Sequence, residues 1–248
     1  MSMTPRRAAL VTGAGRNIGR AIAIGLAQDG LNVVINGSAD RSAAEAVAAE
    51  ARAFGVQAAV AMGDVGRPED CAQIAAEALA TFGTVDVLVN NAALRPAKPF
   101  LEIGVEDWRR VMAVDLEAAV WLSQAVLPGM LEQGWGRIVN FTGMNAIHGY
   151  SGRAPVSVAK HGVWGLTKSL AKEFGSRGVT VNAISPGPIA SDGDDPSADA
   201  HRQGYVAKVP VGRMGTPAEV ATVVRMLVSE GGAFVNGQML QVNGGAET

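Results

Sequence analysis

Short apolar runs alternate with stretches of helical hydrophobic period along the whole chain. Each run is four to six residues long and mostly apolar, and Ala8–Val11 is apolar at every position, which is typical of a strand buried on both faces of a parallel sheet. The runs predict seven strands, at Ala8–Val11, Asn32–Asn36, Val56–Ala61, Val85–Asn90, Arg137–Phe141, Val179–Ile184 and Gln238–Val242.

Helical patterns fill the spaces between these runs. The helix after the first run begins near Ile18, and the others are expected at Ser42–Phe54, from Pro68 to just before Gly83, from Val105 to about Met130, at Val156–Phe174 and at Pro217–Val228. Strands that alternate with helices imply right-handed crossovers. We therefore expect α/β architecture: one doubly wound Rossmann-type domain over residues 1–248, with a seven-stranded, mostly parallel sheet flanked by helices.

The segment from Ala8 to Gly30 reads as strand, glycine turn and helix in immediate succession. Gly13 and Gly19 permit a tight turn and a close backbone approach, so the free N–H groups of the helix can face a pyrophosphate. This order predicts a dinucleotide site. Residues 186–210 form one long irregular stretch, for which we expect a substrate lid.

Composition narrows the classes of partner. The 248 residues carry a net charge of −2 with both signs scattered, which argues against nucleic acid and favours a small-molecule substrate. The single cysteine, Cys71, is expected to pack in the core. No apolar run is expected to be a signal peptide or to span a membrane, so we expect a cytoplasmic protein.

No metal site is expected from the sequence. Histidines occur at dispersed positions, and the carboxylates of the irregular segment lack ligand spacing; these residues are His148, His161, His201, Asp192, Asp194 and Asp195.

The second strand indicates which nucleotide is preferred. It ends Asn36-Gly37-Ser38 and lacks the acidic residue that would accept a hydrogen bond from the 2′-hydroxyl of NAD. Arg16 and Arg41 are placed to pair with a 2′-phosphate, which favours NADP, with NAD as the alternative. In the competing interpretation both arginines are merely solvated.

Several motifs resemble the short-chain dehydrogenase/reductase superfamily over nearly the whole length. TGAGRNIG at Thr12–Gly19 is similar to its cofactor turn, Asn90-Asn91-Ala92-Ala93 to its NNAG element, and the helix after Lys160 to its active-site helix. The resemblance, with the cofactor reasoning above, implies these nucleotide contacts: Gly13, Arg16, Asn17, Ile18, Gly19, Asn36, Ser38, Arg41, Asp64, Val65, Asn91, Ala92, Ala93, Lys160, Pro186, Gly187, Ile189 and Ser191.

The same resemblance implies a homotetramer. Its interfaces would be the helices around Trp108–Leu127 and Val156–Phe174 and the carboxy-terminal strand, whose motif is Val242-Asn243-Gly244-Gly245.

The resemblance breaks at the catalytic positions. Val156 stands where the family has its tyrosine, Gly143 where it has its serine, and Asp115 where it has its asparagine, so Lys160 is the only unchanged member of the four. In the cofactor turn, Asn17 replaces the middle glycine, and asparagine tolerates left-handed dihedrals better than most residues. Reduction of a ketone needs a proton on oxygen, so ordinary carbonyl chemistry is in doubt.

Three hypotheses account for this loss. In the first, Asp115 and Lys160 support hydride transfer to an enoyl or imine substrate, as in the peroxisomal-type 2,4-dienoyl-CoA reductases, whose aspartate and lysine these two residues resemble. In the second, a polar residue of the 144–155 loop replaces the tyrosine; the available side chains are His148, Tyr150 and Arg153. In the third, the chain is no longer an oxidoreductase but a catalytically inactive cofactor-binding subunit or regulator, or a non-redox enzyme on the same fold.

Pairing between Asp115 and Lys160 would shift their pKa values. If the pair is buried, we expect the lysine to stay positive and to lower the pKa of the aspartate. The competing interpretation is that Asp115 only holds a water or pairs structurally with the lysine, and that Lys160 is a solvated helix residue.

Overall fold

The computed structural model describes residues 6–191, 204 and 206–247. Its centre is a seven-stranded sheet in the order β3-β2-β1-β4-β5-β6-β7, in which every pairing is parallel. The strands are β1 (Ala8–Val11), β2 (Asn32–Gly37), β3 (Ala58–Met62), β4 (Val87–Asn90), β5 (Gly136–Phe141), β6 (Val179–Pro186) and β7 (Met239–Val242). The expected fold class is confirmed.

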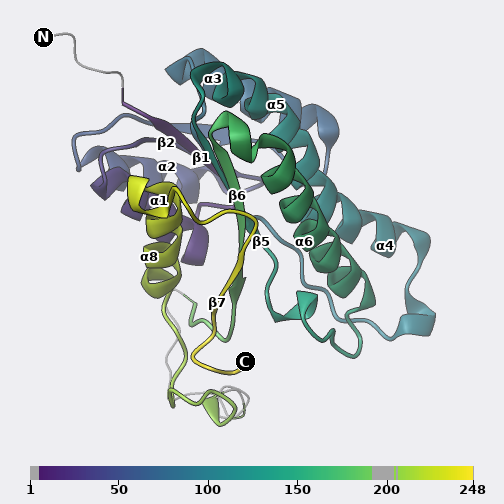
Figure 1. Cartoon of the computed structure of the whole chain (residues 1–248). Helices are drawn as coiled ribbons and strands as arrows, with labels where there is room; N and C mark the ends of the chain where they lie inside the picture. The colour runs from purple at the N-terminus through teal and green to yellow at the C-terminus, as the bar shows by residue number, and fades with distance from the viewer. Residues whose placement is uncertain (1–5, 192–203, 205, 248) are drawn as a thin grey trace, which may run out of the picture.

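Helices cover both faces of this sheet (Figure 1). On one face lie α1 (Asn17–Gln28), α2 (Arg41–Arg52) and α8 (Pro217–Val228); on the other lie α3 (Pro68–Phe82), α4 (Val105–Met112), α5 (Ala118–Gln133) and α6 (Ala154–Phe174). Side chains of β1 alternate between two cores: Ala9 and Val11 belong to one, Leu10 to the other. This alternation explains why the run is apolar at every position.

Helix ends follow the local sequence signals. Asp40 caps α2 by accepting a hydrogen bond from the N–H of Ala43 at 2.9 Å, and Thr216 with Glu219 forms a capping box at α8. Gly83 takes a φ of +76° at the end of α3, the left-handed conformation for which glycine is suited. Short 3₁₀ turns occur at Phe100–Glu102, Met144–Ala146, Gly175–Arg177 and Glu230–Gly232.

The long helical region after β4 differs from its prediction. A π-helical turn at Ala113–Glu117 separates α4 from α5, where the pattern predicted one continuous helix. A π turn inserts one residue into the helical register, a feature often found at functional sites. Here it contains the buried Asp115.

The sequence analysis expected no apolar run long enough to span a membrane, and one helical region passes that test. By length and composition, Val105–Gln133 is apolar enough to cross a membrane, yet half of its most apolar window is buried inside the protein. This run packs against α3 and β5, as a core helix does. Cys71 is fully buried, which confirms its packing role. The predicted lid falls mostly on residues 192–203 and 205, which lie outside the described part of the chain.

Candidate active site

The glycine turn after β1 is shaped by steric limits. Gly13 has a φ of +60°, and a Cβ placed on Gly19 would lie 2.3 Å from the carbonyl oxygen of Gly13. Asn17 has a φ of +50° and is the one non-glycine residue with a positive φ in the described part of the chain. Asparagine accepts this conformation at modest cost, so the turn keeps its shape without the family's middle glycine.

Two asparagine side chains brace this turn from behind. Asn91 donates from Nδ2 to the carbonyl oxygens of Thr12 and Gly13, at 2.9 and 3.2 Å. Asn36 is buried; it accepts from the N–H of Gly13 and donates to the carbonyl oxygens of Ala61 and Gly63. Both asparagines therefore hold protein backbone with their side-chain groups, and the turn is fixed before any ligand arrives.

A cleft of about 710 Å³ opens in front of the turn at the carboxyl ends of the strands. Its size is in the range of small-molecule and cofactor sites. Almost all of the expected nucleotide contacts line it: Gly13, Arg16, Asn17, Ile18, Gly19, Asn36, Ser38, Asp64, Val65, Asn91, Ala92, Ala93, Pro186, Gly187, Ile189 and Ser191. Of the remaining two, Lys160 lines an adjoining small cavity, and Arg41 lines neither space.

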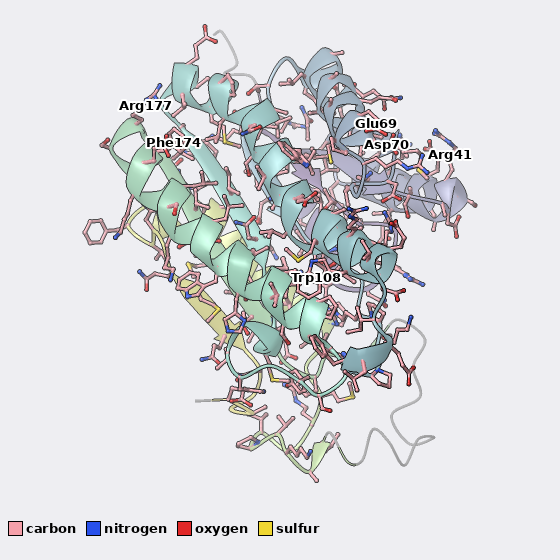
Figure 2. The ribbon with its side chains drawn as sticks, turned by 90° about the vertical axis from the view of Figure 1, so that its right-hand side faces the viewer. Arg41, Glu69, Asp70, Trp108, Phe174 and Arg177 are labelled. Carbon is pink, nitrogen blue, oxygen red and sulfur yellow. The ribbon has the colours of Figure 1, made fainter. Side chains whose placement is uncertain are left out.

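The end of β2 departs from the expected phosphate site. Arg41 is exposed at the outer edge of the molecule (Figure 2) and lies 3.8 Å from the carboxylate of Glu45, so the structure does not place it at the ribose. Arg16 is exposed and lines the cleft together with Ser38. The sequence analysis overlooked Asp40, whose carboxylate also belongs to this lining while it caps α2.

Asp64 is held in place by a partner that the sequence analysis did not identify. Its Oδ2 lies 2.8 Å from the guanidinium of Arg110 on α4, and its Oδ1 accepts from the N–H of Gly66. Although partial burial acts in the opposite direction, Gly66 and Arg110 together hold the pKa of Asp64 below its usual value. The carboxylate is therefore ionised and fixed at the wall of the cleft.

The cleft ends inward at a buried ion pair. Lys160 Nζ lies 3.7 Å from Asp115 Oδ2, and the two side chains are 6% and 0% exposed. Asp115 Oδ1 accepts a 2.6 Å hydrogen bond from the N–H of Leu94, which ties the loop after β4 to the π turn. The interpretation of Lys160 as a solvated helix residue is therefore wrong.

The protonation of this pair also differs from the expectation. Burial raises the pKa of Asp115 above its usual value, against the lowering effect of Lys160. Burial likewise lowers the pKa of Lys160, against the raising effect of Asp115. Because desolvation disfavours both charges, each group is shifted toward its neutral form, and the predicted lowering of the aspartate pKa is not found.

A cavity of about 10 Å³ adjoins the pair, with Thr12, Asn90 and Phe141 among its lining residues. This volume is about that of a single water. Asp115 Oδ2 and Asn90 Oδ1 are buried and accept no hydrogen bond from the described residues. Two unsatisfied acceptors beside a water-sized space give this cavity the polarity to hold one water.

The two positions that correspond to the family's missing hydroxyls differ in their surroundings. Val156 is 1% exposed and packs with Val111 and Ala159 in a small apolar cluster between α4 and α6. Gly143 has a φ of +76°, and a Cβ there would meet no atom within 4 Å. The position of Val156 is thus filled by packing, whereas the position of Gly143 is open.

Two of the substitutes proposed for the tyrosine, His148 and Tyr150, lie elsewhere. His148 is exposed, with Nδ1 3.3 Å from the carboxylate of Glu247, and its ring meets the exposed Tyr150 edge to face at 5.0 Å between centroids. Neither side chain lines the cleft or the small cavity. The structure therefore does not bring them together with Asp115 and Lys160.

Arg95 is the functional candidate that sequence reasoning missed altogether. It lines the cleft two residues beyond Ala93 and is exposed. The signal was available, because ligands of α/β sheets lie at the carboxyl ends of strands and Arg95 is the first charge after β4. Among the described residues, no group of three or more His, Cys, Asp or Glu is placed to hold a metal.

The fold, the glycine turn and the buried lysine define a class of nucleotide-dependent oxidoreductases. A family profile described as Enoyl-(Acyl carrier protein) reductase matches residues 13–247. The chain belongs to the short-chain dehydrogenase/reductase superfamily.

Curated relatives span nearly the whole chain. It is 37% identical over 239 residues to the 3-oxoacyl-(acyl-carrier-protein) reductase FabG of Staphylococcus epidermidis, covering 96% of this chain and 98% of the relative. It is 40% identical over 240 residues to nodulation protein G of Azospirillum brasilense, covering 97% and 98%. Among solved structures, acetoin dehydrogenase YohF from Salmonella typhimurium superposes with a TM-score of 0.90 at 34% identity, covering 98% of this chain and 96% of that one.

Proposed function

We propose that this chain is an NADP(H)-binding oxidoreductase that works through the Asp115–Lys160 pair in place of a catalytic tyrosine and serine. The observation that carries the proposal is the position of this pair, buried at the inner end of a cleft whose lining includes a rigid phosphate-binding turn. A buried ion pair is costly to maintain, and a purely structural helix contact would not require one.

The cleft fits a dinucleotide. The turn that includes Gly13 and Gly19 would hold the pyrophosphate at the start of α1, where any side chain on Gly19 would collide with the backbone. Asp64 and Val65 would contact the adenine. The ribose and nicotinamide would lie along Asn91–Ala93, Lys160 and the segment from Pro186 to Ser191. When bound, the reduced nicotinamide supplies a hydride.

Arg16 and Ser38 support NADP over NAD. Both line the cleft near the start of α2, so a 2′-phosphate there would meet a guanidinium, a hydroxyl and the positive end of a helix dipole. The carboxylate of Asp40 would repel a 2′-phosphate, but one of its oxygens is engaged in capping α2. NAD is the alternative cofactor.

The substrate class follows from the groups that are absent. Val156 and Gly143 carry no hydroxyl, so no side chain at these two positions can protonate a carbonyl oxygen. Hydride addition to a conjugated C=C or to an iminium avoids that requirement, provided that charge is stabilised nearby. We propose an enoyl or imine substrate before a ketone, in line with the description of the matching family profile.

Asp115 and Lys160 would supply the charge and the proton relay that the reaction needs. The raised pKa of Asp115 and the lowered pKa of Lys160 bring the two groups closer in proton affinity, so a proton can pass between them at less cost than in water. Asp115 Oδ2 adjoins the water-sized cavity and is the atom from which such a proton can be relayed.

Turnover assays test this proposal. Oxidation of NADPH is followed by stopped flow with a panel of enoyl thioesters, imines and ketones, using wild type and Lys160→Met. We expect turnover on enoyl or imine compounds that falls at least a hundredfold in the variant. Turnover confined to ketones, or unchanged in Lys160→Met, would contradict it. Tight nucleotide binding without turnover would favour the alternative of a catalytically inactive subunit, which the loss of both hydroxyls also supports.

A further inference from the structure

Arg95 and Arg153 form no ion pair with a carboxylate of the described residues. Arg95 lies on the loop after β4 and lines the cleft, and Arg153 is the residue immediately before α6. Arg95 is exposed, whereas Arg153 is partly buried. Neither residue has a role in the function proposed above, and neither corresponds to a motif of the superfamily noted in the sequence.

Backbone contacts bring the two arginines to one place. Leu94 donates its N–H to Asp115, which fixes the residue directly before Arg95 onto the buried pair. Four residues further on, the N–H of Lys98 donates to the carbonyl oxygen of Gly152 at 2.8 Å, next to Arg153. The charges of Asp115 and Arg153 both act on Arg95. The two guanidinium groups therefore belong to a single electrostatic site beside Lys160.

The other cations near this site form ion pairs with carboxylates of the described residues, whereas Arg95 and Arg153 do not. Lys98 pairs with Asp107, Arg109 with Glu106 and Arg110 with Asp64. No carboxylate of the described residues lies within ion-pair distance of Arg95 or Arg153. Among the described residues, Asp115 is the acidic group whose charge acts on Arg95, and it is already engaged with Lys160 and Leu94. Two like charges held together without a counter-ion favour an anionic ligand.

We propose that Arg95 and Arg153 bind a carboxylate of the substrate, next to the bond that is reduced. The inference rests on the proposed function and names its substrate class as a small unsaturated or imino acid. Arg95 follows directly on Leu94, whose N–H is hydrogen-bonded to Asp115, and this closeness along the backbone favours an anion near the reacting atoms.

Binding measurements test this without requiring turnover. Crotonate and its neutral isostere crotonamide are titrated by calorimetry into the full-length protein, with and without saturating NADP⁺. We expect crotonate to bind about tenfold or more tightly than crotonamide, since a charge-assisted pair is stronger than a neutral one. Arg95→Gln and Arg153→Gln should each remove most of this preference.

Arg109→Gln is the matched control, because Arg109 is exposed on α4 and pairs with Glu106. It should leave the preference for crotonate intact. Equal binding of crotonate and crotonamide, absence of crotonate binding, or an equal loss in the Arg109 variant would overturn the proposal. Failure of NADP⁺ to bind while crotonate still distinguishes the arginine variants would instead contradict only the proposed function.

Discussion

Asp115 Oδ2 and Lys160 Nζ lie 3.7 Å apart with almost no exposure to solvent, so each charge depends on the other. Removing one partner strands the other in a medium of low polarity, which typically costs about 3–5 kcal/mol. We expect Lys160→Met and Asp115→Asn each to lower the free energy of unfolding by about that amount. The double variant should lose less than the sum, as measured by urea denaturation.

The two single variants should respond to pH in opposite directions. A buried carboxyl with a raised pKa favours folding at low pH and loses that contribution as pH rises above the ordinary carboxyl pKa and through the folded one, so Lys160→Met should become less stable as pH rises. A lysine with a lowered pKa does the reverse, so Asp115→Asn should become less stable as pH falls below the ordinary lysine pKa and through the folded one. Parallel slopes in the two variants would contradict burial as the cause.

Nucleotide selectivity should depend on Arg16 and not on Arg41. Loss of a guanidinium that faces a 2′-phosphate should weaken NADPH binding about tenfold and leave NADH binding nearly unchanged. Arg16→Ala is the test, and Arg41→Ala is its control because Arg41 lies outside the cleft and pairs with Glu45. Fluorescence titration with both nucleotides measures the effect. An equal loss in both variants would argue against this assignment.

Restoring the family's hydroxyls should produce carbonyl reduction at a cost in stability. Val156→Tyr forces a larger side chain into a packed apolar cluster, and overpacking of this kind costs about 1–3 kcal/mol. Gly143→Ser meets open space but a strained φ of +76°. We expect the double variant to gain NADPH-dependent ketone reduction and to melt at a lower temperature. Val156→Phe with Gly143→Ser is the control without a phenol; ketone reduction there would contradict the account.

Association into tetramers is a prediction that the exposed apolar side chains support. Large hydrophobic residues are exposed in or near α4, α5 and α6: Leu101, Val105, Trp121 and Val158. Burial of such a patch between copies would remove it from water. Light scattering should give a mass near four chains, and Trp121→Glu combined with Val158→Glu should reduce it. A monomer for the wild type would contradict the prediction.

The fold could be predicted from sequence because apolar runs and helical period alternate without ambiguity. The glycine turn could also be predicted, including the positive φ of Asn17, since both follow from local steric limits. The π turn that contains Asp115 could not, because it depends on packing between α4 and α6 and not on residue preference.

The sequence analysis also failed to predict several electrostatic contacts of the site. Arg110 lies far along the chain from Asp64, so their pairing does not follow from spacing in the sequence. Arg41 and Glu45 lie four residues apart on α2, so their pairing could have been predicted from helical spacing. The pKa of Asp115 was mispredicted because the expectation counted the attraction of Lys160 and left out the larger cost of desolvating the carboxylate. Arg95 was overlooked because it falls just beyond the motif that was recognised.

Direct titration of the full-length protein with NADPH tests the central claim, that a pyridine nucleotide binds in the cleft. The account predicts saturable binding of one nucleotide per chain, followed by the change in NADPH fluorescence. Gly19→Val should abolish this binding, because any side chain there meets the carbonyl oxygen of Gly13. Absence of saturation by millimolar NADPH or NADH, in a wild-type sample whose circular dichroism shows it to be folded, would contradict the account.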